Sequence, residues 1–246
     1  MTGPEALEIH QNGGSLQGVD LSFAEMAGAD LTGANLTGAD LVGANLSGVD
    51  LTGANLTRAD LSTADLIGAN LTGVNLTGAR LIYAQIERGN LTGSCLIGAD
   101  LSDVNLQGGA DLTDTDLTRA ELNGAYMEGA NLTGANLTNA SLVSAYLDGT
   151  NLTGANLMGA DLAAATANKA NLTNANLTNA NLTDMWMAEA NLQDAKLVGA
   201  TLSRSDLAGV NLSGVDISGV DLSSTDLSSA IMPDGTIHAQ SEELDW

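Results

Sequence analysis

Few side chains in this sequence have the types and spacing that catalysis or metal binding requires. His10 and His238 lie near opposite ends of the chain, and Cys95 is the only cysteine and has no triad partner in sight. The three acids between residues 111 and 116 lack the spacing of a calcium-binding loop. We therefore expect no catalytic residue, no metal site and no cofactor, and the protein is predicted not to be an enzyme.

The net charge of the chain indicates which kinds of partner it can bind. The formal net charge is −23, from 30 acidic and 7 basic residues. Phosphate would be repelled by this charge, so direct binding of nucleic acid is not expected. A basic protein, such as one that itself binds DNA, is a suitable partner. The alternative is that the charge only keeps an apolar rod soluble.

An apolar residue recurs every five positions along almost the whole chain. The series runs from Leu16 to Leu106, takes one extra residue at Gly108–Gly109, and continues from Leu112 to Leu227. A small residue stands two positions before each Leu, with Asn or Asp between them, and Thr or Ser and often Gly follow. Self-similarity of this kind indicates a solenoid built from stacked repeats.

A period of five fits neither a helix nor a simple strand. If the small residue and the Leu both point inward, the Asn or Asp between them points outward, and the glycine turns the corner. On this interpretation Leu132→Lys collapses several coils, whereas Asn131→Lys costs little. The predicted structural core includes Leu31, Leu36, Leu41, Leu46, Leu132 and Leu137.

Individual repeats match a known consensus literally. Residues 34–38 read Ala-Asn-Leu-Thr-Gly and residues 54–57 read Ala-Asn-Leu-Thr. This pattern resembles the A(D/N)LXX consensus of the pentapeptide-repeat family and is most similar to cyanobacterial members. The resemblance implies an all-β, right-handed quadrilateral β-helix of about eleven coils, roughly 50 Å long at the usual strand spacing.

The pattern also divides the chain. We expect residues 1–14 to form an N-terminal cap and residues 15–230 to form the β-helix, with a small bulge at the 108–109 insertion. Residues 231–246 are predicted to be a C-terminal cap and an acidic tail, with Pro233, Asp234 and Gly235 making a turn.

Four repeats per coil would stack residues twenty apart, so each side can be named by its first outward residue. Most acids then fall on the Asp20 face and the adjacent Glu25 face, which together we call the acidic edge. Three exposed aromatic residues also share the Glu25 face, and aromatics beside charge are typical interface anchors. The candidate interaction residues are Asp20, Asp40, Asp60, Asp100, Glu121, Glu128, Asp148, Asp161, Tyr126, Tyr146 and Trp186.

The Asp30 face carries an unbroken column of threonines from Thr32 to Thr173. A flat threonine array is a means of binding ice. Threonine is also a good strand residue that stacks well on itself, which is the stronger interpretation.

These observations predict a non-catalytic scaffold or regulator that binds an unidentified protein partner. The alternative is a DNA mimic that modulates DNA gyrase or topoisomerase, as some family members do; net −23 over the rod is about one charge per 2.2 Å, against about 1.7 Å in DNA. Phe is absent from the central repeat position, which weakens that alternative. An ice-binding or purely structural rod is the second alternative.

No secretion signal and no membrane span are apparent, so we expect a cytoplasmic protein that does not bind membranes. The rod is expected to be a monomer or a weak end-to-end dimer.

Overall fold

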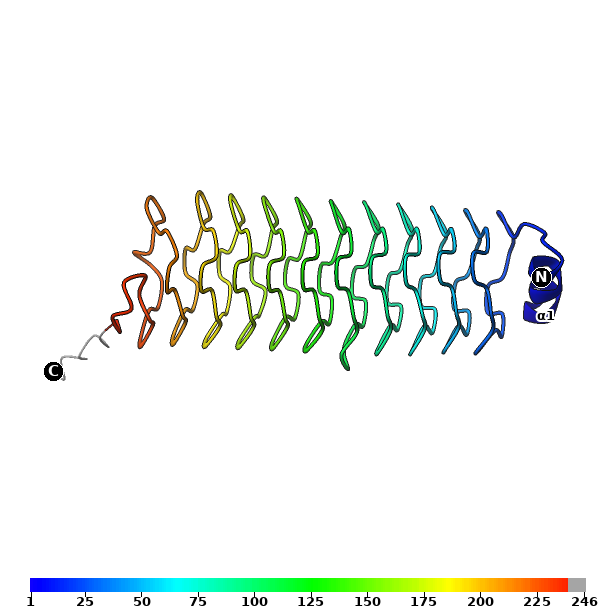
Figure 1. Cartoon of the computed structure of the whole chain (residues 1–246), viewed down its shortest axis with the longest axis horizontal. Helices are drawn as coiled ribbons and strands as arrows, with labels where there is room; N and C mark the ends of the chain where they lie inside the picture. The colour runs from blue at the N-terminus through cyan, green and yellow to red at the C-terminus, as the bar shows by residue number, and fades with distance from the viewer. Residues whose placement is uncertain (239–246) are drawn as a thin grey trace.

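The computed structural model describes residues 1–238 as a short helix followed by a long rod of stacked coils (Figure 1). Helix α1 spans Gly3–Gln11. In the rod each Asn or Asp position pairs in parallel with the residue twenty further on, as in Asp20 with Asp40 and Asp40 with Asp60. Twenty residues are four repeats of five, so every coil has four sides. Each side pairs through a single bridge, not through an extended strand.

Two residues of every repeat fill the inside of the rod. Leu31, Leu36 and Leu41 are 0% exposed, and the small residue Ala34 is 2% exposed. Leu46, Leu132 and Leu137 are buried in the same way. Each buried leucine contributes about 1.5–3 kcal/mol relative to an exposed one. The core is thus a stack of leucines lined by alanines.

A tight turn closes each corner. The Ala34 amide donates to the Leu31 carbonyl at 2.9 Å, and Gly33 between them has a φ of 67°. Turns with a positive φ at the third position, such as type II turns, favour glycine there. Some corners carry other residues in this conformation, among them Thr63 and Tyr83, both with a φ of 58°.

The insertion at Gly108–Gly109 enlarges one corner and leaves the stack intact. Both glycines have positive φ values, 72° and 85°. Across the insertion the pairing distance is one residue longer, since Asn90 pairs with Asp111. The larger loop projects beyond its neighbours in the green part of the rod (Figure 1).

Helix α1 covers the N-terminal end of the rod. Thr2 and Glu5 form a reciprocal capping box at its start, and Pro4 stands in its first turn. Ala6 is fully buried, and Gly3 lies so close to the carbonyl of Glu25 that no side chain fits there. No helix within residues 1–238 is long and apolar enough to cross a membrane.

The C-terminal end is covered less completely. Ile231 and Ile237 pair antiparallel around the turn at residues 233–235, where the Gly235 amide donates to the Met232 carbonyl at 2.8 Å. The inward residues Ile217, Leu222 and Leu227 of the last coil are only partly buried. The predicted acidic tail, from residue 241 onward, lies outside the described residues.

Candidate interaction surface

The Asp30 face satisfies its own polar groups. The Thr52 hydroxyl donates to Asp50 Oδ1 at 2.6 Å and accepts from the Asn70 amide of the next coil at 2.9 Å. The same link recurs at Asn131, Asn151 and Asn171. At each of these four asparagines the amide therefore ties its coil to the preceding one. Because the threonine hydroxyls are used in this ladder, the array is poorly suited to binding ice.

The N-terminal half of the Asp20 face lacks this ladder because its outward residues are carboxylates, which have no hydrogen to donate. Asp20 Oδ1 accepts from the Ser22 hydroxyl at 2.6 Å and from the Ser22 amide at 3.0 Å, and these bonds lower the pKa of Asp20. Asp40 Oδ1 accepts only from the Val42 amide, at 3.1 Å. Within residues 1–238 the second oxygen of each carboxylate accepts no protein hydrogen bond.

One cation interrupts the acidic column. Arg80 stands between Asp60 and Asp100 in the pairing order, and its Nε lies 3.8 Å from Asp60 Oδ2. Its side chain is 60% exposed, so this ion pair adds little stability. The column therefore consists of two acidic groups, one from Asp20 to Asp60 and one at Asp100 and Glu121.

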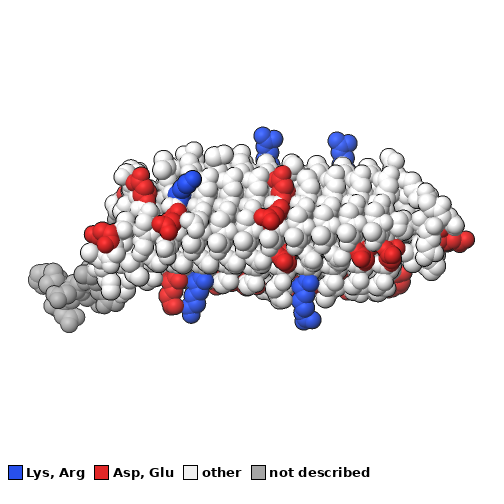
Figure 2. Space-filling model, in the orientation of Figure 1, with Lys and Arg blue, Asp and Glu red and all other residues white. Residues whose placement is uncertain are grey.

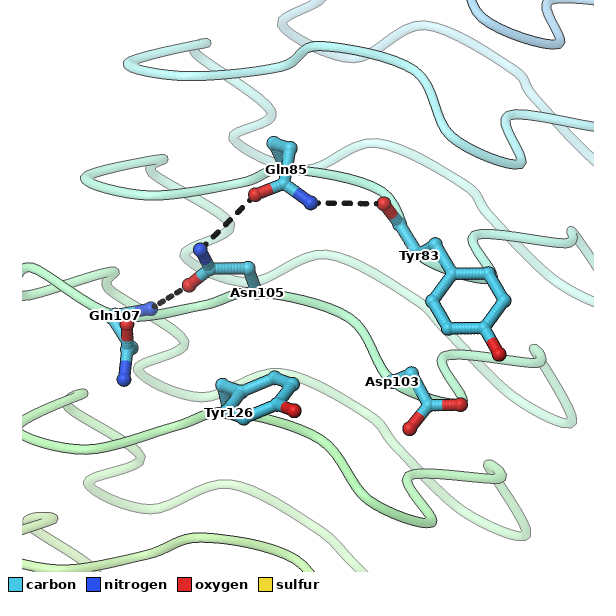
Figure 3. Close-up of a pocket in the computed structure, with 6 residues that line it drawn as sticks. All are labelled: Tyr83, Gln85, Asp103, Asn105, Gln107 and Tyr126. Carbon is cyan, nitrogen blue, oxygen red and sulfur yellow. Dashed lines mark hydrogen bonds between the residues drawn. The ribbon is translucent and has the colours of Figure 1, made fainter.

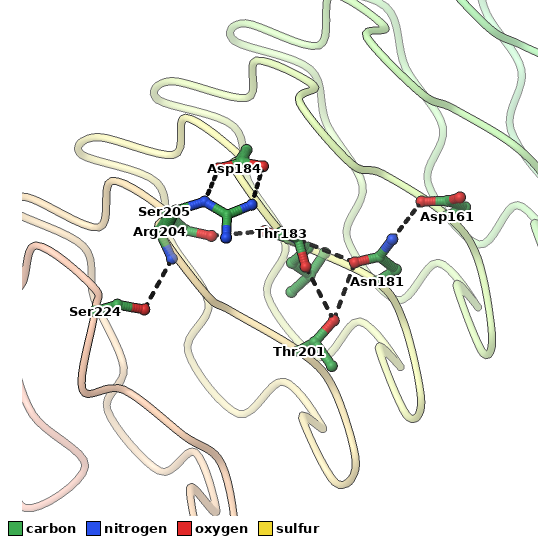
Figure 4. Close-up of polar contacts among 9 residues, drawn as sticks. Asp161, Asn181, Thr183, Asp184, Thr201, Arg204, Ser205 and Ser224 are labelled. Carbon is green, nitrogen blue, oxygen red and sulfur yellow. Dashed lines mark hydrogen bonds and ion pairs between the residues drawn. The ribbon is translucent and has the colours of Figure 1, made fainter.

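Two acids in the C-terminal half of the Asp20 face bond to side chains of the next coil (Figure 4). The Asn181 amide donates to Asp161 Oδ1 at 2.9 Å. Arg204 binds both oxygens of Asp184 at 2.6 Å, and this bond lowers the pKa of Asp184 and raises that of Arg204. Asp161, a predicted interaction residue, is thus less available to a partner than Asp20, Asp40 or Asp100.

Two of the three predicted aromatic residues form a stack on the Glu25 face. The rings of Tyr126 and Tyr146 lie parallel within 4°, with centroids 5.0 Å apart. Thr166 separates Tyr146 from Trp186, whose side chain is 61% exposed. The structure therefore brings the two tyrosines together and leaves the tryptophan two coils beyond Tyr146.

The two acids predicted beside these rings differ in their bonding. Asp148 Oδ1 accepts from the Asn168 backbone amide at 2.8 Å. Glu128 Oε2 is buried and has no hydrogen-bond partner within residues 1–238. Within residues 1–238 Glu128 also forms no ion pair.

A hollow of about 330 Å³ adjoins the tyrosine stack (Figure 3). Its lining residues are Tyr83, Gln85, Asp103, Asn105, Gln107 and Tyr126. Tyr83 was not among the predicted site residues, although an aromatic at a corner usually filled by glycine is visible in the sequence. It is 56% exposed.

Charge is spread unevenly over the rod. Figure 2 shows a long face with few charged side chains; acidic ones lie along its lower part, and two basic ones project from its lower edge. Cys95 occupies an outward asparagine position, with its Sγ 3.3 Å from the Thr77 hydroxyl. In the part of the chain that the structure describes, no group of three or more His, Cys, Asp or Glu is placed to hold a metal ion.

The five-residue repeat and the four-sided coil define a solenoid repeat protein. The family model described as pentapeptide repeats matches it in eight copies, so the chain belongs to the pentapeptide-repeat family. The matches cover residues 15–53, 54–93, 71–108, 94–139, 115–154, 155–194, 187–223 and 195–232.

Several solved structures are similar to the chain. HetL, a pentapeptide repeat protein involved in heterocyst differentiation regulation in the cyanobacterium Nostoc, is 34% identical, with 97% of this chain and 100% of that chain covered and a TM-score of 0.46. Full-length QnrB1, a plasmid-mediated fluoroquinolone resistance protein, is 18% identical, with 82% and 90% covered and a TM-score of 0.47. Rfr23 from the cyanobacterium Cyanothece is 26% identical, with 66% and 90% covered and a TM-score of 0.20. Among curated proteins no relative matches the chain.

Proposed function

We propose that this protein is a non-catalytic scaffold or regulator that binds a basic protein along the acidic edge. The observation that supports this most is the bonding of Asp20, Asp40 and Asp100. These carboxylates accept hydrogen bonds only from their own repeats and none from a neighbouring coil within residues 1–238, whereas Asp50 and Asp111 of the Asp30 face also accept from an Asn amide of the next coil.

The chemistry of the edge suits a partner rich in Lys and Arg. Carboxylates arranged in a column attract a basic surface and accelerate its association. The tyrosine stack beside them supplies rigid, partly exposed rings, which are the kind of residue that anchors interfaces. Attraction and anchoring therefore come from adjacent faces of the same coils.

The remaining features of the working protein are part of the same proposal. The rod would wind right-handed, as the family resemblance implies, with residues 15–230 as one domain, and would act in the cytoplasm. The partly buried residues of the last coil, Ile217, Leu222 and Leu227, would support a weak end-to-end dimer. The partner could be gyrase or topoisomerase if the edge mimics DNA.

Affinity capture from a bacterial lysate at moderate salt tests the proposal. Three baits are compared: the native protein, a variant of the edge and a variant with equal charge loss elsewhere. The edge variant has Asn at Asp20, Asp40, Asp60 and Asp100. The control variant has Asn at Asp30, Asp50, Asp111 and Asp116. Asn is the usual residue at these repeat positions, so both variants should fold.

We expect the native and control baits to retain a protein that the edge variant does not retain. Once this protein is purified, it should bind the native and control proteins more tightly than the edge variant. If that protein is a gyrase subunit, the DNA-mimic alternative replaces the scaffold hypothesis. Equal retention by all three baits would contradict a role for the acidic edge.

A further inference from the structure

The hollow beside Tyr126 is the open end of an aromatic stack. The next residue in the column toward the C-terminus, Tyr146, covers one side of the Tyr126 ring. The preceding residue in the column is Asn105, which carries no ring to continue the stack. The side of Tyr126 toward Asn105 therefore borders the hollow, with Tyr83 across from it (Figure 3). A planar group entering here would extend the stack by one member.

Two amide side chains on one side of the hollow have already used their hydrogen bonds. The Gln85 amide donates to the Tyr83 carbonyl at 3.0 Å, and Gln85 Oε1 accepts from Asn105 at 3.1 Å. Asn105 also donates to Glu87 Oε1 at 2.6 Å. These groups form a fixed surface that shapes the hollow, and they offer little further bonding to a ligand.

The carboxylate of Asp103 is uncommitted. It lies on the same side of the hollow as the Tyr83 ring, and within residues 1–238 its oxygens make no hydrogen bond or ion pair (Figure 3). The site thus combines an exposed ring face with unneutralised negative charge.

We propose that the hollow binds the guanidinium group of an arginine side chain from the protein partner. Guanidinium is planar and cationic, stacks on aromatic rings and pairs with carboxylates through several N–H donors. A lysine ammonium is compact and more strongly hydrated, so it gains less from the ring. A nucleotide base would also stack, but its phosphate would be repelled by the net charge of −23. This inference rests on the proposed function and specifies the partner's chemistry at one point.

The tyrosines provide a direct measurement, because the chain has only three and they all lie at or beside the hollow. We would label their rings with ¹³C, assign the three signals with single Phe variants, and titrate with the tripeptide acetyl-Gly-Arg-Gly-amide. The matched probe is acetyl-Gly-Lys-Gly-amide. We expect saturable shifts of the Tyr83 and Tyr126 signals, with an affinity roughly five-fold higher for the arginine peptide.

Two variants locate the site. Asp103→Asn should weaken arginine binding about five-fold or more, because it removes the charge-assisted bond. It should fold, because Asn139 and Asn174 occupy equivalent corners with φ values of 55° and 59°. Tyr126→Asn should abolish the shift of the Tyr83 signal. Asp30→Asn is the control, with equal charge loss on the Asp30 face, and should leave the titration unchanged.

Equal affinity for the two peptides, an equal effect of Asp30→Asn and Asp103→Asn, or no saturable shift would each overturn the inference. Failure of the proposed function appears in a different experiment. If lysate capture does not depend on the acidic edge but the hollow still prefers the arginine peptide to the lysine peptide, the arginine site is supported and the role of the acidic edge is rejected.

Discussion

The Asp30 face and the Asp20 face share one backbone geometry and one period, yet they use their side chains in opposite ways. On the Asp30 face Asn70 donates to Thr52 in the preceding coil at 2.9 Å, and the pattern repeats. On the Asp20 face Asp40 replaces the amide with a carboxylate, which accepts within its own coil and donates nothing. Exchanging NH₂ for O⁻ therefore changes a face from one that holds coils together to one that can attract a partner.

The largest expected effect lies in the core that both faces share. Leu132→Lys places a charge where the side chain is 0% exposed, and we expect a loss of about 3–5 kcal/mol or more in the free energy of unfolding. Chemical denaturation followed by circular dichroism measures it. If the variant melts like the native protein, residue 132 does not point inward and the assignment of both faces is wrong.

The second prediction compares the two faces directly. Asn131 donates to Asp111 Oδ1 at 3.1 Å and to the Thr113 hydroxyl at 2.8 Å, so Asn131→Ala should cost about 1–3 kcal/mol. Asp40→Ala, which removes one acceptor from an exposed position, should cost less than about 1 kcal/mol. Equal costs in paired urea denaturations would remove the distinction between the faces. From the sequence alone, Asn131→Lys was expected to cost little stability. Because the structure shows that Asn131 bonds to the preceding coil, we now expect this substitution to lower the free energy of unfolding measurably.

The third prediction tests whether a positive φ favours glycine at the corners of both the Asp20 face and the Asp30 face. Thr63, on the acidic edge, holds a φ of 58°, so Thr63→Gly should stabilise the rod by about 0.5–1 kcal/mol. Gly73, at a corner of the Asp30 face with a φ of 63°, has open space around it, so Gly73→Thr should destabilise it by about 1–2 kcal/mol from backbone strain alone. Thermal melts of the two variants should move in opposite directions. If both variants shift the melting temperature in the same direction, the backbone angle φ does not determine residue preference at these corners.

The smallest effect concerns pH. The Thr113 hydroxyl holds the pKa of Asp111 below its ordinary value of 3.8. Since the folded state favours the ionised carboxylate, its contribution is present above pH 3.8 and is lost as the pH falls through the lowered pKa. Asp111→Asn cannot titrate, so the stability difference between native protein and variant should change below pH 4 and stay constant from pH 5 to 7. A constant difference throughout the acid range would contradict the lowered pKa.

The sequence predicts the repetitive part of this molecule well, because a period of five decides which residues lie inside. Leu31 and Leu132 could be assigned to the core without coordinates, and the match to the family model confirms the family. The stacking columns also follow from the period once four sides are assumed.

Features outside the period were harder to predict. Helix α1 precedes the first repeat, and its signal, Thr2 with Glu5 three residues later, is local and unrelated to the leucine pattern. The hollow depends on a size difference between Asn105 and Tyr126 in one column and on Tyr83 at a corner, so it appears only when neighbouring coils are compared. The neutralisation of Asp184 by Arg204 likewise needs side-chain positions.

The pairing interval also restricts how such a gene can grow. Duplicating one five-residue repeat would rotate everything downstream by a quarter turn and separate Tyr126 from the acids that precede it along the rod. Only duplications of twenty residues keep each column in line, as the pairing of Asp20 with Asp40 requires. The single residue gained at Gly108–Gly109 is absorbed at a corner and leaves every later column in place. Lineages of this protein should therefore differ in length by whole coils or by small corner insertions, and rarely by one repeat.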